Sequence, residues 1–273
     1  MPSFDSEITK AIWGGKLPLR ITCLTDDASE WEPIHIEAPR CSYFPLIAQK
    51  LHDIYTGLGL QVDKENIWFD YQGEPLKWHY PIGLLYDLNV FGTATPTMDE
   101  AVIPWCINIH WRHFPADKLL RNPSIDAAQD IFMSMLKEAD YLRHGNTKKV
   151  MNLSKRDQTQ LWQSLSVDDH DKYWEVNEHL LENEHQQWRH IPVRLYLPNN
   201  GVLQEAVPYH DTEGTAYTIA DVISRIMPKL SLTTAIPVMH GIPLTMDIPA
   251  EWASKNLAYA DNFLHIVLSK SRE

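Results

Sequence analysis

Apolar and polar residues alternate along several short stretches in the first 115 residues, as they do in half-buried strands. One stretch differs, because its apolar residues recur at helical spacing and Gly57 and Gly59 close it. The pattern predicts the order β-β-α-β-α-β: strands at 17–24 and 32–38, a helix over 46–58, a strand at 67–71, a short helix at 82–88 and a strand at 105–111.

The same order recurs near the C-terminus. It comprises strands at 193–197 and 201–207, a helix over 218–227, a strand at 236–240, a helix over 250–257 and a strand at 262–268. Both copies carry Gly-x-Pro-Leu after the third strand, at 73–76 and 241–244. In each copy we expect the glycine to supply a positive φ and the proline to preset the turn. This plan is that of a ubiquitin-like β-grasp fold.

Helix signals fill the residues between the two copies. Ser124 is a candidate N-cap and Gly145 a candidate stop for a first helix, Ser154 precedes a second, and Asp168 is expected to open a third. The predicted fold class is α+β, with two ubiquitin-like β-grasp domains flanking a helix-rich domain. The predicted divisions are an N-terminal helix at 1–15, a first ubiquitin-like domain at 16–115, a helix-rich domain at 116–187 and a second ubiquitin-like domain at 188–273.

Charge is distributed unevenly. The formal net charge of −12 over 273 residues argues against an ordinary basic nucleic-acid binder, so we expect no nucleic-acid partner. Residues 112–156 nevertheless hold nine Lys or Arg against five Asp or Glu. A basic loop from Lys148 to Arg156 is therefore a candidate for contact with anionic lipid, with an ordinary solvated loop as the alternative.

Membrane and secretion signals are missing from the pattern. No run approaches the ~20 apolar residues that cross a bilayer, and the start lacks a basic segment followed by an apolar one. The three cysteines, Cys23, Cys41 and Cys106, are odd in number and widely spaced, which disfavours a disulfide framework. We expect a cytoplasmic protein.

Motifs for catalysis are also missing. The sequence has no Walker loop, dinucleotide fingerprint, nucleophile elbow or Cys-x-x-Cys pair, so we expect no catalytic residue and no cofactor. Cys106, His110 and His113 are possible metal ligands, because positions four apart on a strand share a face. Ordinary packing of an aromatic strand is the favoured interpretation, and we expect no metal site.

One lysine stands apart on the helix framed by Ser124 and Gly145. Its apolar stripe is formed by Ile125, Ala128, Phe132, Met135, Leu136, Ala139 and Leu142. Lys137 falls about 160° from the centre of that stripe and must face water. Met133 and Tyr141 lie four residues to either side, also away from the stripe, which predicts apolar docking neighbours around an accessible amine. The alternative is an ordinary solvated lysine.

Three stretches carry a resemblance to a known family: 67–85 (IWFDYQGEPLKWHYPIGLL), 132–140 (FMSMLKEAD) and 261–266 (DNFLHI). The sequence resembles the autophagy protein 5 family over essentially its whole length. The resemblance implies two ubiquitin-like domains around a helix-rich domain. It also implies that Lys137 accepts the C-terminal glycine of the ubiquitin-like autophagy protein 12 through an isopeptide bond. Leu136 stands where some relatives have methionine, a volume-conserving change.

The resemblance further implies partners and a place of action. Separate activating and conjugating enzymes of the autophagy system would perform the reaction, so this chain would be a non-catalytic acceptor and scaffold. With the coiled-coil autophagy protein 16 it would form a ligase-like assembly. That assembly would promote transfer of autophagy protein 8 to phosphatidylethanolamine at the isolation (preautophagosomal) membrane, which it would contact peripherally.

Two other functions stay open. One is an interaction adaptor whose ubiquitin-like domains bind partners without covalent modification. The other is a metal- or cysteine-dependent hydrolase using Cys106 and His110. Trp13, Trp78 and Tyr80 are candidates to line a groove for a partner helix, with core packing as the favoured alternative.

Overall fold

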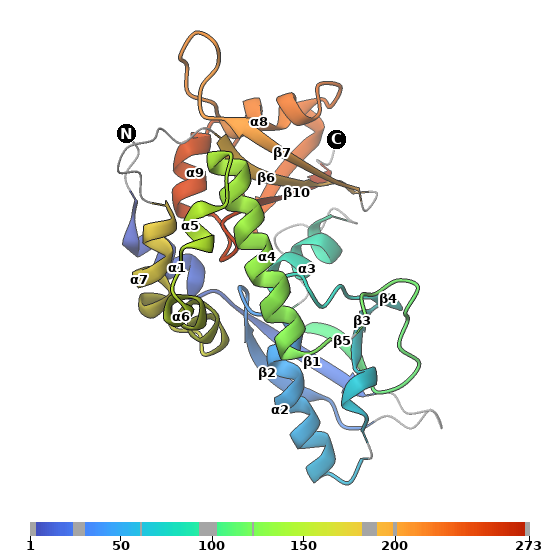
Figure 1. Cartoon of the computed structure of the whole chain (residues 1–273). Coiled ribbons are helices and arrows are strands. Elements are labelled where there is room, and N and C mark those ends of the chain that lie inside the picture. The colour runs from blue at the N-terminus through green and yellow to red at the C-terminus, as the bar shows by residue number, and fades with distance from the viewer. Residues whose placement is uncertain are drawn as a thin grey trace.

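The computed structural model describes residues 4–23, 31–60, 62–92, 103–121, 123–181, 190–198 and 201–270. Within them lie two five-stranded sheets with helices packed between and around them (Figure 1). None of the helices in this part of the chain is both long enough and apolar enough to cross a bilayer.

The first sheet has the strand order β2-β1-β5-β3-β4. Its centre is a parallel pair of β1 and β5, and β1 also pairs antiparallel with β2. A helix, α2, begins with Pro45 in its first turn and buries Phe44, Leu51 and Tyr55. The elements are β1 (Lys16–Cys23), β2 (Ile34–Pro39), α2 (Phe44–Gly57), a 3₁₀ turn (Lys64–Asn66), β3 (Trp68–Tyr71), β4 (Glu74–Pro75), α3 (Ile82–Tyr86), a π-helical turn (Asp87–Phe91) and β5 (Trp105–His110).

The second sheet repeats this topology in the order β7-β6-β10-β8-β9, with β6 and β10 as the parallel pair. Its elements are β6 (His190–Tyr196), β7 (Val202–Pro208), α8 (Ile219–Ile226), a 3₁₀ turn (Leu232–Thr234), β8 (Ala235–Met239), β9 (Ile242–Pro243), α9 (Ala250–Asn256) and β10 (Leu264–Lys270). The predicted strands and helices are all present, with ends that differ by a few residues. Leu24, the last residue of the first predicted strand, lies outside the described residues.

The repeated Gly-x-Pro-Leu motif forms the same hairpin twice. Gln72 and Gly73 have φ values of 53° and 83°, and His240 and Gly241 have 53° and 77°, so two successive positive φ angles make each turn. The expected role of the glycine is confirmed, but that of the proline is wrong. Pro75 and Pro243 follow the turns and lie in the two-residue edge strands β4 and β9, which the sequence pattern did not predict.

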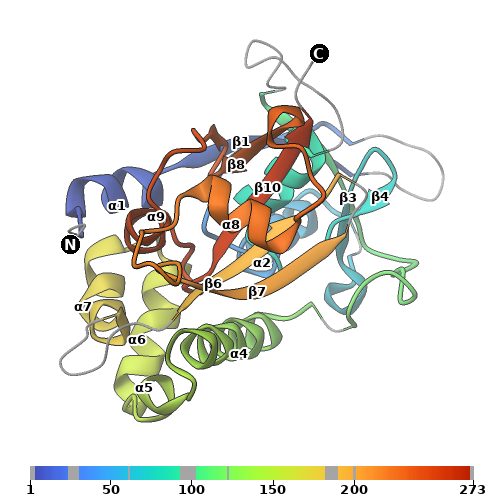
Figure 2. The same ribbon diagram turned by 90° about the horizontal axis from the view of Figure 1, so that it is seen from above.

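The helical part comprises α4 (Ile125–His144), α5 (Lys148–Met151), α6 (Lys155–Ser166) and α7 (His170–Leu181). The N-terminal helix α1 (Ser6–Trp13) lies beside α7 and α9 (Figure 2), with Trp13 packed on Tyr173 at 4.8 Å between ring centroids. Asp168 does not open α7 as expected: it has a φ of 61°, and Asp169 caps the helix by accepting from Lys172 N.

Two hydrophobic cores hold these parts together. One lies inside the second ubiquitin-like domain, under α8 and α9. The other fills the first ubiquitin-like domain and the helical part, and it extends to Tyr196, Val238 and Val267 of the second sheet. The central strands of the second sheet, β6 and β10, are therefore covered on both faces, with α8 and α9 on one side and α4 and the π-helical turn on the other (Figure 1).

A buried ion pair joins the two ubiquitin-like domains. Arg40 Nη2 lies 2.5 Å from Asp87 Oδ1, and the other oxygen of Asp87 accepts from Gly241 N at 2.9 Å. Both side chains are almost fully buried. The contact fixes the turn between β8 and β9 against the first domain.

Candidate functional site

Lys137 lies in the middle of α4, a helix 20 residues long with well-defined ends. Ser124 Oγ accepts from Ala127 N at 3.1 Å, and the acidic Asp126 stands in the first turn. At the other end Gly145 has a φ of 75° and donates to Tyr141 O at 2.7 Å. Both predicted ends are confirmed.

The Lys137 side chain is exposed, and among the described residues its ammonium group has no hydrogen-bond or ion-pair partner. Tyr141, one turn further, is 57% exposed. Met133 is not: at 9% exposure it belongs to the first core, so its expected place as an exposed docking neighbour is wrong. The amine is thus flanked by one exposed aromatic ring and not by two apolar side chains.

The buried face of α4 is wider than the predicted stripe. It includes Asp140, Arg143 and His144, whereas Ile125, expected inside, is 40% exposed. The reason is that α4 contacts α2, α5, β6 and β7, so that different turns are covered by different neighbours. A single stripe describes a helix on one surface, and α4 lies between several.

Glu138, next to Lys137, ties the helix to the second sheet. Its Oε2 lies 3.1 Å from Arg194 Nη2 on β6, and its Oε1 accepts from Gln204 Nε2 on β7 at 2.8 Å. Arg194 in turn stacks its guanidinium over Phe263, 4.8 Å from the ring centroid. These contacts hold the turn that carries Lys137.

Arg143 fixes the last turn of α4 from inside the protein. It is 2% exposed and donates to Tyr209 Oη at 3.2 Å, Ser254 Oγ at 3.2 Å and the Asn262 carbonyl at 3.0 Å. The sequence pattern does not predict this buried role of Arg143, because its hydrogen-bond partners lie far away in the chain.

Asp140 performs a similar task for α5. Its Oδ2 accepts from Val150 N at 3.2 Å, and burial raises its pKa above the usual carboxyl value. His144 lies beside it, and burial lowers the pKa of that imidazole to about 4, so His144 is neutral near pH 7. Buried polar contacts therefore hold the part of α4 that follows Lys137.

The basic segment 148–156 is not one loop, as expected, but α5 and the start of α6. Lys149 turns toward α7 and donates to the Leu180 carbonyl at 3.2 Å. Lys148, Lys155 and Arg156 are exposed. Only part of the predicted basic surface thus faces solvent.

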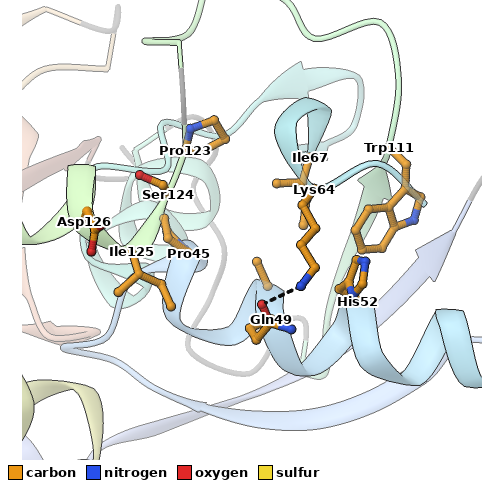
Figure 3. A pocket seen from close by; sticks show the side chains of 11 residues that line it. Pro45, Gln49, His52, Lys64, Ile67, Trp111, Pro123, Ser124, Ile125 and Asp126 are labelled. Atoms are coloured by element: carbon orange, nitrogen blue, oxygen red, sulfur yellow. Dashed lines mark hydrogen bonds between the residues drawn. The ribbon is translucent and has the colours of Figure 1, made fainter.

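A cleft of about 280 Å³ opens between α2, the end of β5 and the first turn of α4 (Figure 3). Ile125 and Trp111 contribute apolar surface, and Lys64 Nζ donates to Gln49 Oε1 at 3.1 Å on its rim. This explains why Ile125 is exposed: it lines a cleft at a domain boundary. The sequence pattern gave no sign of it.

The alternative site around Cys106 does not assemble. His110 is hydrogen-bonded to Asp70 and stacked on Trp68 at 3.9 Å between ring centroids, while Cys106 is exposed. Burial alone would raise the pKa of Asp70, but hydrogen bonds from His110, Gly73 and Asn108 bring it below its ordinary value. Within the described residues no three His, Cys, Asp or Glu side chains gather as metal ligands.

The three aromatic residues that were candidates to line a partner groove lie in different environments. Trp13 and Trp78 belong to the first core, and Trp78 Nε1 donates to the Leu120 carbonyl at 2.7 Å. Tyr80 is half-buried and packs edge-on against Tyr196, with 6.0 Å between ring centroids. Core packing, the favoured alternative, holds for both tryptophans.

Comparison with known proteins shows which family has this architecture. Family models for autophagy protein ATG5 match in order: its UblA domain at 12–111, its alpha-helical bundle region at 125–183 and its UblB domain at 190–268. Autophagy protein 5 of Phaeosphaeria nodorum is 33% identical over 96% of both chains. That of Drosophila melanogaster is 31% identical, also over 96% of both. The chain belongs to the autophagy protein 5 family.

The fold of the family agrees with the one described above. The crystal structure of Kluyveromyces marxianus Atg5 superposes with a TM-score of 0.80 at 20% identity, covering 96% of this chain and 99% of that one. Two ubiquitin-like domains around a helical region are confirmed as the fold class. The domain limits at 15/16, 115/116 and 187/188 stay predictions, and the last lies outside the described residues.

Proposed function

We propose that this chain is a covalent acceptor in autophagy: Lys137 Nζ forms an isopeptide bond with the C-terminal glycine of the ubiquitin-like autophagy protein 12. The uncharged amine attacks the thioester carbonyl on a conjugating enzyme, a C–N bond replaces the C–S bond, and the enzyme thiol leaves as the amine loses a proton. The chain itself contributes no catalytic residue and serves as acceptor and scaffold.

One observation carries this proposal: Lys137 is exposed and, among the described residues, unpaired, on a helix that Glu138 and Arg143 tie to the second ubiquitin-like domain. An acceptor amine must reach an enzyme-bound thioester and lose its proton, and a rigid support lowers the entropy cost of presenting it. Membership of the autophagy protein 5 family supports the same assignment.

The test is the mass of the protein isolated from its own cells. Lys137→Arg should remove an adduct of ubiquitin-like size while leaving the chain folded, because the side chain is exposed. Lys50→Arg is the matched control, since Lys50 is an exposed lysine in the middle of another helix, α2. An adduct that survives in Lys137→Arg would contradict the assignment. Wild-type chain without any adduct would favour the non-covalent adaptor instead.

The assembly around the acceptor is part of the proposal. The conjugate would bind the coiled-coil autophagy protein 16 and promote transfer of autophagy protein 8 to phosphatidylethanolamine. It would be cytoplasmic and recruited peripherally to the isolation membrane. Co-purification with the N-terminal helix of the coiled-coil partner, followed by crosslinking, checks this step. A chain that never retains that helix would contradict it.

A further inference from the structure

Lysine side chains in the described residues fall into two groups. Many are engaged: Lys172 Nζ lies 2.8 Å from Asp169 Oδ2 and Lys10 Nζ 3.0 Å from Asp171 Oδ1. Others have no partner within the part of the chain that the structure describes, namely Lys50, Lys137, Lys148, Lys155 and Lys229. Of these, only Lys50 and Lys137 lie in the interior of a helix.

Helix geometry makes the unpaired state of Lys137 unexpected. Asp140 follows it by three residues, the spacing at which a lysine and a carboxylate normally meet on a helix surface. Asp140 is instead 6% exposed, and its Oδ2 accepts from Val150 N at 3.2 Å. Its carboxylate is thus turned into the protein.

A backbone donor of α5 draws the Asp140 carboxylate into the protein. Val150 is the third residue of that short helix, and its N–H is a donor that an N-cap side chain ordinarily satisfies. The side chain of the local N-cap residue, Thr147, makes no capping hydrogen bond. Asp140 supplies the missing cap from the neighbouring helix α4.

Lys50 offers the matched case. Asp53 follows it by the same three residues on α2, yet the Asp53 side chain is 65% exposed. Its Oδ1 accepts from Gln49 Nε2 at 2.7 Å and lies 3.2 Å from His52 Nδ1, both at the surface. Lys50 is thus unpaired while the carboxylate three residues away is engaged at the surface, whereas the carboxylate of Asp140 is engaged inside the protein.

We infer that Asp140 is a positioning residue for the acceptor amine: by capping α5 it withholds its carboxylate from Lys137. This rests on the proposed function of Lys137 as acceptor. A carboxylate beside an ammonium group favours the charged form, which cannot attack a thioester. Withholding it spares Lys137 that competing interaction.

The experiment measures acetylation of each lysine in the full chain by dilute acetic anhydride, followed by peptide mass spectrometry across a pH series. Asp140→Asn keeps an oxygen for the α5 cap and should leave the rate at Lys137 unchanged. Asp169→Asn removes the carboxylate that lies 2.8 Å from Lys172 Nζ and should speed acetylation of Lys172 by about 1.5- to 5-fold, the range of exposed ion pairs. Lys172, whose partner lies at 2.8 Å, should be slower than Lys137.

A second variant supplies the carboxylate that Asp140 withholds. Ser134 is exposed and precedes Lys137 by three residues, so Ser134→Glu should slow Lys137 by about 1.5- to 5-fold and move its rate profile to higher pH. Ser134→Gln, which matches it in size without the charge, should change neither. A purely structural effect would not separate these two variants.

Two results would overturn the inference. Asp140→Asn speeding Lys137 as much as Asp169→Asn speeds Lys172 would mean that Asp140 already pairs with Lys137. Equal acetylation rates of Lys137 in Ser134→Glu and Ser134→Gln would mean that pairing with a carboxylate does not control the reactivity of Lys137. Neither measurement involves a conjugating enzyme, so the cellular adduct in Lys137→Arg tests the proposed function separately.

Discussion

The two ubiquitin-like domains place different chemistry at equivalent positions. Cys106 on β5 pairs with Arg20 on β1, and His265 on β10 pairs with Arg194 on β6, in the same register of the central parallel pair. Cys106 is exposed, whereas His265 is 2% exposed and hydrogen-bonded to Asp261. One topology therefore supports a solvated position in one domain and a buried polar contact in the other.

The next position on the same face repeats the contrast. Asn108 on β5 is half-buried, and Val267 on β10 is 1% exposed. The difference arises because the first core and α4 cover this face of the second sheet. Strand topology thus determines which residues share a face, and the neighbouring parts of the protein determine whether that face is excluded from solvent.

The largest expected effect concerns the contact between the domains. Asp87→Ala leaves Arg40 buried without its carboxylate and removes the acceptor for Gly241 N, so we expect a loss of about 3–5 kcal/mol in unfolding free energy. Urea unfolding measures it. Asp87→Asn retains the acceptor for Gly241 and should lose less. A loss below about 1 kcal/mol in Asp87→Ala would show that the domains do not depend on this pair.

Exchanging the equivalent residues tests the contrast between the sheets directly. Val267→Asn buries an amide in the first core and should cost about 2–4 kcal/mol. The reverse change, Asn108→Val, loses the hydrogen bond to Asp70 at 3.1 Å and should cost less than about 1.5 kcal/mol. Equal costs in thermal or urea unfolding would contradict the difference in burial.

A pH effect should separate the two hairpins. His240 occupies the position of Gln72, and burial lowers its pKa to about 3. The unfolded imidazole binds a proton near pH 6.5 and the folded one does not, so its contribution to stability is present above pH 6.5 and lost as the pH falls. Between pH 7 and 5 this amounts to about 2 kcal/mol.

Replacing that histidine by the residue of the first domain is the test. His240→Gln should reduce the fall in unfolding free energy between pH 7 and 5 by about 2 kcal/mol relative to wild type. Titrating carboxylates contribute to the pH dependence of unfolding free energy in both proteins, so only the difference between the two curves is informative. Parallel pH curves for the two proteins would show that His240 is protonated in the folded state.

The smallest effect distinguishes the two turn glycines. An alanine Cβ at position 73 meets nothing within 4 Å, so Gly73→Ala should cost only the positive-φ strain, about 1 kcal/mol. At Gly241 the same atom would lie 3.2 Å from the Arg40 guanidinium, which should add about 1 kcal/mol. Equal losses in urea unfolding would mean that Arg40 moves aside without cost.

Much of the fold is visible in short sequence segments. Ser124 and Gly145 marked the ends of α4, and the shared Gly-x-Pro-Leu motif marked two equivalent hairpins. Asp168 shows the limit of such local signals, because Asp169 beside it has the same side chain and makes the cap. The two-residue strands β4 and β9 were missed because they are too short to show alternation.

The candidate site was predictable only in part. The position of Lys137 opposite the apolar stripe predicted its exposure. The burial and orientation of the neighbouring side chains could not be predicted from the same pattern. Met133 is buried against the first core, and Asp140 faces α5. Sequence spacing places side chains around one helix, and it does not say which other segments cover them.

By itself the sequence determined the period of each element, the caps of α4, the two-fold repeat of the β-grasp order and the exposure of one central lysine. Only the tertiary structure decided that the central strands β6 and β10 of the second sheet are buried on both faces, that Glu138 and Arg143 anchor α4, and that Asp140 turns away from Lys137. The physical reason is the separation along the chain over which each effect acts. Periodicity and capping act within a few residues, whereas burial and hydrogen bonding of a charged side chain depend on partners brought close by the whole fold.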